Sequence, residues 1–173
     1  AALDGATHHE RVEATRRFDK KLQRKLFEQA EGRSPDINQF VPHDDTYRPV
    51  HHFGKNTLFP FVIDRFQKRF ARVPGQEDVL YGYNENWYRF AISPGYYVAY
   101  MDDTTGELVI DYTRVPEGRP DEWPTILPNW FGLGPFVYMG MKDRMRRVSD
   151  HVTIGRAFKK KPMNAWFVLV REP

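Results

Sequence analysis

The sequence predicts an α+β domain in which two N-terminal helices precede an antiparallel curved sheet or barrel of about seven strands. Residues 1–75 carry the periodicity of helices, whereas residues 76–173 alternate apolar and polar positions as strands do. The strands follow one another through turn residues, without the intervening helices that a parallel sheet needs. At 173 residues, the chain fits a single domain with one core.

A first helix is expected between Thr7 and Gly32. Thr7 and Glu10 have the spacing of a capping box, and glycine commonly ends a helix. Apolar residues recur at mostly four-residue spacing, and most other positions are basic: Arg16, Arg17, Lys20, Lys21, Arg24 and Lys25. This basic face is either a solvated helix surface, which is the commoner case, or a docking strip for anionic lipid or an acidic protein.

A second helix is expected over residues 57–73. Pro60 fits its first turn, and Pro74 with Gly75 ends it. Three prolines between residues 33 and 55 predict an extended connection before this helix. The residues that would share one helical face are Phe59, Val62, Ile63, Phe66 and Phe70.

The remainder of the chain reads as strands separated by turn residues. Ser93-Pro94-Gly95 predicts a hairpin between the first two strands, and residues 115–135 form a long proline-rich loop. The last strand is apolar on both faces, as a strand buried between layers is. The expected strands cover residues 86–92, 96–101, 107–113, 136–141, 144–149, 151–158 and 165–172.

Composition excludes several classes of protein. The chain has no cysteine, so it has neither a disulfide framework nor a thiolate nucleophile nor a cysteine-ligated metal. The formal charge of +3 and the pI of about 9.1 are too small to indicate nucleic acid, although they suit an anionic membrane surface or an acidic protein. No apolar run is long enough to cross a bilayer, and the N-terminus has no signal-peptide pattern, so an intracellular location is expected.

Two clusters suggest catalytic chemistry. His43, Asp44, His51 and His52 are metal-ligand types close together in sequence, and they define the alternative hypothesis of a metal-dependent enzyme that uses a loop from His43 to His52. The commoner reading is that these side chains cap turns and satisfy local backbone groups. Ser149, Asp150 and His151 resemble a triad only superficially, because neighbours on a strand point to opposite faces.

The abundance of large apolar side chains favours a pocket. Aromatic residues make up 15% of the chain, which is more than an ordinary core of this size needs. Antiparallel sheets that curl on themselves enclose cavities for small ligands. Trp87, Tyr97 and Met139 lie on or beside the expected strands and are the candidate lining residues from this part of the chain.

The C-terminal strands resemble the signature of the plastid lipid-associated proteins, or fibrillins. Residues 150–156, DHVTIGR, and 166–171, WFVLVR, follow the family's order of an acidic residue, a strand of the type L-R-I-S-R-G and a last strand of the type L-F-V-L-x-K. The resemblance implies a lipocalin-like barrel that binds a lipid, quinone or carotenoid-like molecule at the periphery of a photosynthetic membrane in a plastid. It also implies that Asp150 and Arg156 lie near the cavity mouth, with Ile154, Phe167 and Leu169 lining or closing the cavity.

Three hypotheses about function follow. The first is a non-catalytic protein that binds a hydrophobic ligand or docks as an accessory subunit on a membrane-associated complex. The second is the metal-dependent enzyme. The third is a purely structural interaction subunit whose sheet encloses a solid core.

Overall fold

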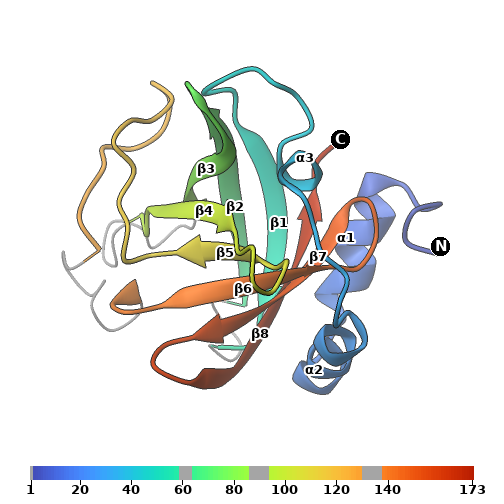
Figure 1. The fold of residues 1–173 in the computed structure, drawn as a ribbon. Coiled ribbons are helices and arrows are strands. Elements are labelled where there is room, and N and C mark those ends of the chain that lie inside the picture. The colour runs from blue at the N-terminus through green and yellow to red at the C-terminus, as the bar shows by residue number, and fades with distance from the viewer. Residues whose placement is uncertain (1, 59–63, 86–93, 130–137) are drawn as a thin grey trace.

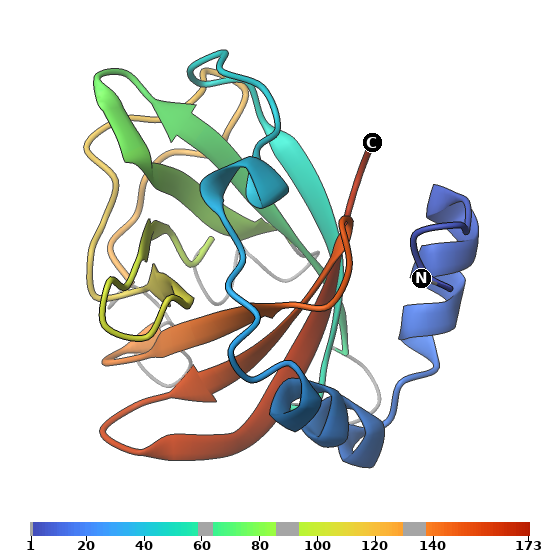
Figure 2. The same cartoon turned by 45° about the vertical axis from the view of Figure 1, so that its right-hand side comes forward.

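The chain folds as a closed barrel of eight antiparallel strands with its helices on the outside (Figures 1 and 2). This is a computed structural model, and it describes residues 2–58, 64–85, 94–129 and 138–173. Each strand pairs with the next one along the chain, and β1 pairs with β8 to close the barrel. The predicted antiparallel sheet is therefore confirmed, with eight strands in place of about seven.

The strands are 4 to 10 residues long, and they are hydrogen-bonded to one another in sequence order. Closure leaves no strand edge without a partner, which removes the aggregation hazard of an open sheet. The strands are β1 (Val50–Asn56), β2 (Arg65–Val73), β3 (Gln76–Glu85), β4 (Tyr97–Met101), β5 (Leu108–Asp111), β6 (Lys142–Arg147), β7 (Val152–Phe158) and β8 (Pro162–Arg171).

The N-terminal segment forms α1 (His8–Arg16) and α2 (Lys20–Gln29), where one helix was expected. Thr7 and Glu10 make the predicted capping box. Asp19 starts a new helix, because its side chain accepts a hydrogen bond from the backbone N–H of Leu22. No helix in the described ranges combines the length and the apolar character of a membrane span.

The helix α2 covers the outer face of β7 and β8, and α1 covers β8 and β1. The apolar side of each helix meets the side chains of these strands that point away from the barrel interior. The packed residues include Val12, Phe27, Ala30, Val152, Ile154, Trp166, Val168 and Val170. The basic residues of α2 are left exposed on the opposite side of the helix.

The predicted second helix is wrong for the residues that the structure describes. Residues 65–73 form β2, which pairs with β1 on one side and β3 on the other. Phe66, Lys68 and Phe70 are alternate residues on this strand, a pattern that the helical interpretation overlooked. The other residues of the expected helical face, Phe59, Val62 and Ile63, lie outside the described residues.

The predicted connection over residues 33–55 is also wrong in part. It contains the short helix α3 (Ile37–Phe40) and most of β1. The expected strand at 136–141 is not present in its described part, where residues 138–140 form a turn and Gly140 has φ of 69°. The expected strand at 86–92 lies outside the described residues, and the partner of β4 is β3.

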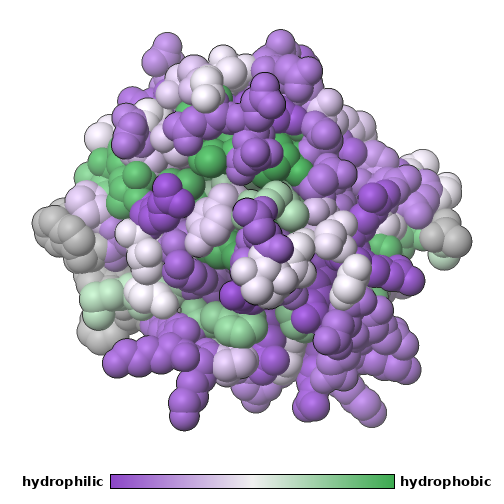
Figure 3. Space-filling view, in the orientation of Figure 1, coloured by the Kyte–Doolittle hydropathy of each residue, from purple (hydrophilic) through white to green (hydrophobic). Residues whose placement is uncertain are grey.

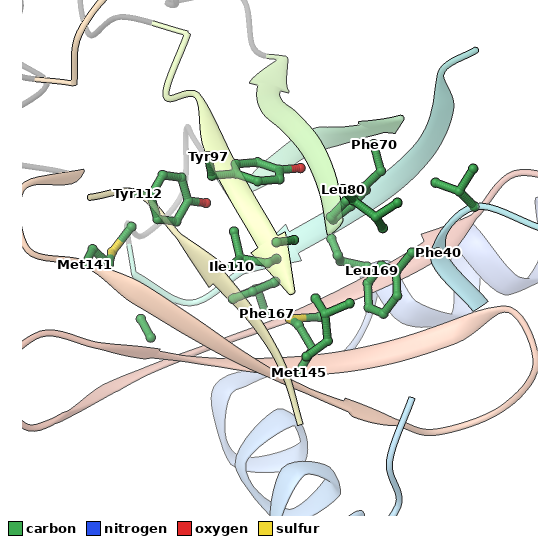
Figure 4. Close-up of a cluster of buried hydrophobic side chains, with 14 of the residues drawn as sticks. Phe40, Phe70, Leu80, Tyr97, Ile110, Tyr112, Met141, Met145, Phe167 and Leu169 are labelled. Carbon is green, nitrogen blue, oxygen red and sulfur yellow. The ribbon is translucent and has the colours of Figure 1, made fainter. Parts of the chain in front are cut away.

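The barrel interior has two parts (Figure 4). At one end, α3 places Phe40 against the rings of His52 and Phe70, with ring centroids 5.5 and 5.1 Å apart. Tyr97 and Tyr112 lie toward the other side of the cluster, away from Phe40. Phe40 is fully buried, so α3 closes its end of the barrel with an apolar plug.

Replacing this plug should destabilise the fold strongly. Phe40→Ala leaves a cavity between α3 and the barrel, and we expect a loss of about 3 to 5 kcal/mol in the free energy of unfolding, measured by urea denaturation. Leu22→Ala is the control, because Leu22 is 43% exposed on α2. A loss for Phe40→Ala as small as that for the control would contradict the role of α3 as a plug.

Candidate functional site inside the barrel

A lysine is buried inside the barrel. Lys68 on β2 is 2% exposed, and its Nζ donates a 2.8 Å hydrogen bond to Asn84 Oδ1 and a second hydrogen bond to the hydroxyl of Tyr112. Asp143 Oδ2 lies 3.5 Å from the same nitrogen. A lysine ammonium has three N–H donors, so these three oxygens account for all of them.

The strand order brings this polar cluster together from four parts of the sheet. Asn84 is directly opposite Lys68 in the pairing of β2 with β3. Tyr112 follows β5, and its hydroxyl lies 3.3 Å from Asp143 Oδ2, which β6 contributes. All four residues are buried, and they form what we call the lysine cluster.

Aromatic rings surround the ammonium group. The ring centroids of Tyr112, Tyr97, Phe167 and Phe66 lie 4.9, 5.0, 5.2 and 5.5 Å from Lys68 Nζ. Cation–π attraction of this kind is strongest when the cation is removed from water. Glycine is required at position 82, beside these four rings, because a Cβ atom there would lie 2.3 Å from the Tyr97 ring.

Burial shifts the pKa values of the titratable side chains in and around the lysine cluster in the direction that favours their neutral forms. Desolvation lowers the pKa of Lys68 to about 8, although the charge and hydrogen bond of Asp143 oppose the shift. Burial also raises the pKa of Asp143, against the opposing effect of Lys68. The pKa of each of Tyr97 and Tyr112 is raised well above its usual value by burial. At neutral pH the cluster therefore holds one ion pair, with an amine closer to deprotonation than an ordinary lysine.

A buried histidine occupies the closed end of the barrel. His52 Nε2 lies 2.9 Å from the carbonyl oxygen of Phe40, so it donates this hydrogen bond. Burial lowers the pKa of His52 to about 3, although the bond to Phe40 opposes the shift. The ring is therefore neutral at physiological pH and acts as part of the plug.

The structure brings together some of the predicted ligand-binding residues and separates the others. Tyr97, Phe167 and Leu169 lie in the barrel interior (Figure 4). Ile154 packs on the outer face with the helices, because strand alternation sends Gly155 and not Ile154 toward Met145 and Phe167.

The remaining predicted residues lie away from the lysine cluster. Asp150 is exposed in a turn, where it accepts a hydrogen bond from Arg147. Arg156 donates to the carbonyl oxygen of Met163 and stacks over Trp166. Met139 is 64% exposed. Trp87 lies outside the described residues.

The histidine and aspartate residues proposed as metal ligands are not assembled into a site. His51 and His52 are neighbours on β1, so their side chains take opposite faces of the strand. His51 lies 3.0 Å from Glu172 on the outside, whereas His52 is in the interior. Asp44 is exposed, and His43 is only half-buried. The described part of the chain contains no group of three or more potential metal ligands.

Sequence reasoning missed Lys68, Asn84 and Asp143. Lys68 was assigned to a helix, and Asn84 lay just before an expected strand. Asp143 alternates with Met141 and Met145, so these three side chains lie on the same, inward face. This alternation is the feature of the sequence that could have identified Asp143 as a buried carboxylate.

The buried ion pair should show strong coupling. Lys68→Met leaves the Asp143 carboxylate buried without its partner, and we expect a loss of about 3 to 5 kcal/mol in the free energy of unfolding. Adding Asp143→Leu should recover most of this loss, as measured by urea denaturation of the single and double variants. Arg24→Met removes an exposed pair with Glu28 and should cost less than about 1 kcal/mol. Additive effects of the Lys68 and Asp143 changes would rule out the coupling.

His52 should make the fold sensitive to acid. Its pKa in the folded state lies below its ordinary value of 6.5, so below pH 6.5 the unfolded chain takes up a proton that the folded chain does not. Stability is then lost as the pH falls from about 6.5 toward 3, by at most about 1.4 kcal/mol per pH unit.

The test compares the wild type with His52→Gln, which keeps an N–H donor but does not titrate. Urea denaturation between pH 7 and pH 4 should show a smaller loss of stability in the variant. Parallel pH profiles for the two proteins would contradict a buried neutral histidine.

Comparisons of this chain with protein-family models, with curated proteins and with solved structures found no match. The function therefore has to be inferred from the geometry of the chain's own residues. The residues that indicate the function most directly are those of the lysine cluster.

Proposed function

We propose that the barrel binds a small, largely apolar molecule with one hydrogen-bond acceptor, a carboxylate or a carbonyl group, and that Lys68 is its polar anchor. The lysine cluster is the observation that carries this proposal. It places one cationic donor among four aromatic rings in the interior of an eight-stranded barrel.

The chemistry of the interior supports a ligand site. Small-molecule sites combine mostly apolar and aromatic walls with a few convergent polar groups, and barrels of eight strands are just wide enough for side chains or one small ligand. A buried ion pair is seldom the most stable filling for a core, because apolar residues of similar volume commonly match or exceed it. The presence of Lys68 and Asp143 in the interior is explained if the acceptor group of a ligand accepts a hydrogen bond from the ammonium group.

The ligand classes that suit this anchor agree with the lipocalin-like expectation. A fatty acid offers a carboxylate, and a quinone or an oxygenated carotenoid offers an acceptor oxygen at the end of an apolar body. The lysine N–H groups would turn from Asp143 or Asn84 toward that oxygen. In this account the protein is a binding protein and Lys68 performs no covalent step.

A docking role on a membrane-associated complex is the second candidate. The outer surface of α2 supports it, because Lys20, Lys21, Arg24 and Lys25 are exposed. In Figure 3 the surface in the region of α2 is predominantly hydrophilic. Such a face suits an anionic membrane surface or an acidic protein.

The experiment that tests ligand binding combines native mass spectrometry with fluorescence. Protein purified without detergent should carry an extractable apolar molecule, and the delipidated protein should bind cis-parinaric acid saturably. The Lys68→Met, Asp143→Leu double variant should bind this carboxylate probe at least about tenfold more weakly, a change of about 1.4 kcal/mol.

The Arg24→Met variant on α2 is the matched control and should bind the probe as the wild type does. Absence of both a co-purified molecule and saturable probe binding in the wild type would reject the ligand-binding proposal. That result would favour the docking role, in which the barrel core is solid.

A further inference from the structure

Two buried arginines lie where the N-terminal region meets the end of β8. Arg11 on α1 is 7% exposed, and Arg171 at the end of β8 is 9% exposed. Figures 1 and 2 both show α1 alongside the C-terminal end of the chain. Burial lowers the pKa of Arg171, and the positive charge of Arg11 lowers it further, so the two guanidinium groups repel each other.

The two arginines use only neutral acceptors. Arg11 donates to the carbonyl oxygen of Ala6 through Nε at 3.1 Å and through Nη2 at 2.7 Å. Arg171 donates to the carbonyl oxygen of Glu172 at 3.4 Å and, through Nη2, to His151 Nδ1 at 3.2 Å. Arg11 Nη1 and Arg171 Nε are buried and have no hydrogen-bond partner in the described part of the chain.

The neighbouring carboxylates have other partners. Asp150 Oδ1 accepts a hydrogen bond from Arg147, and Asp4 Oδ1 accepts one from the backbone N–H of Asp150 at 2.9 Å. The carboxylate of Glu172 lies 3.0 Å from His51. The charge of Asp150 offsets part of the repulsion at Arg171, but Arg147 shares that charge.

A pair of like charges buried in this way is costly. A buried charge without a paired counter-charge carries a large desolvation penalty, and native structures rarely leave buried N–H groups unused. An anion between the guanidinium groups would offset their repulsion, and it is the kind of acceptor that both unused nitrogens lack. Guanidinium groups bind oxyanions through short, charge-assisted hydrogen bonds, frequently two at a time.

We propose that Arg11, Arg171 and His151 form a binding site for a small oxyanion of the phosphate type. His151 contributes as a neutral ring, because its Nδ1 accepts from Arg171 and its Nε2 then carries the proton. The burial of both arginines favours a free ion over a phospholipid headgroup. This site is separate from the lysine cluster and does not depend on the proposed barrel ligand.

The test is a titration with inorganic phosphate by isothermal calorimetry, in chloride buffers of constant ionic strength. The wild type should bind phosphate saturably with a stoichiometry of one. Arg171→Met should weaken binding at least about tenfold, because it removes a charge-assisted donor. Arg24→Met, which removes an exposed arginine from α2, should bind as the wild type does.

A second readout separates binding from a structural role. Without phosphate, Arg171→Met should unfold at the same temperature as the wild type or a higher one, because it removes one of two repelling charges. With phosphate, only the wild type and Arg24→Met should gain thermal stability. Should Arg171→Met fail to fold, Arg11→Lys keeps a charge but loses the forked geometry, and it should also bind phosphate more weakly.

Three results would overturn the proposal. The first is no saturable binding by the wild type, the second is binding by Arg171→Met and Arg11→Lys equal to that of the wild type, and the third is an equal stability gain in all the proteins, Arg171→Met included. The last result would show general salt stabilisation. Flotation with phosphatidylcholine vesicles that contain phosphatidic acid tests the lipid source. Flotation that depends on Arg171, together with no binding of free phosphate, would overturn the assignment to a free ion.

Discussion

The ion pair between Lys68 and Asp143 is the interaction on which the barrel interior depends. Either charge alone would be expensive to bury, since neither side chain has access to bulk water. Asn84 and Tyr112 accept hydrogen bonds from the ammonium group, and Asp143 supplies its counter-charge. The surrounding aromatic rings then stabilise the cation.

This constraint explains the division of the interior into two regions. Phe40 and His52 close the end under α3 with stacked rings and one hydrogen bond to the backbone. The two charged groups lie on β2 and β6, and the ring of Tyr97 lies between them and the plug, 5.3 Å from Phe70 and 5.0 Å from Lys68 Nζ. The end under α3 stabilises the fold, and the lysine cluster is the group that we propose recognises an acceptor.

Much of the sheet could be predicted from sequence, because alternation with a period of two is a strong local signal. The strands from β4 to β8 were found in this way, as was the capping box at Thr7. The segment around Phe66 and Phe70 was misassigned, because large apolar residues spaced three and four apart also fit a helix. Pairing with β1 and β3 decides its conformation, and a local pattern does not contain that information.

The candidate site was harder to predict than the fold. Phe167 and Leu169, which the family resemblance assigned to the cavity, lie in the interior with Tyr97, whereas Ile154, assigned by the same resemblance, lies on the outer face. The lysine cluster joins residues that are up to 75 positions apart in sequence, between Lys68 and Asp143. Asn84 lies opposite Lys68 in the pairing of β2 with β3, but only the curling of the sheet into a barrel brings Asp143 to Lys68, so no spacing rule along the chain identifies the cluster.

The most direct test of the central claim is the titration of Lys68 itself. In protein labelled with ¹³C at lysine Cε, NMR spectra of the wild type and Lys68→Met identify the Lys68 resonance by its loss. The account predicts that this resonance titrates with a midpoint near pH 8, as a fully buried ammonium group does when Asp143 only partly compensates the burial. A midpoint near the ordinary lysine value of about 10.4 would contradict this prediction, because it would mean either that Asp143 fully compensates the burial or that the ammonium group is exposed.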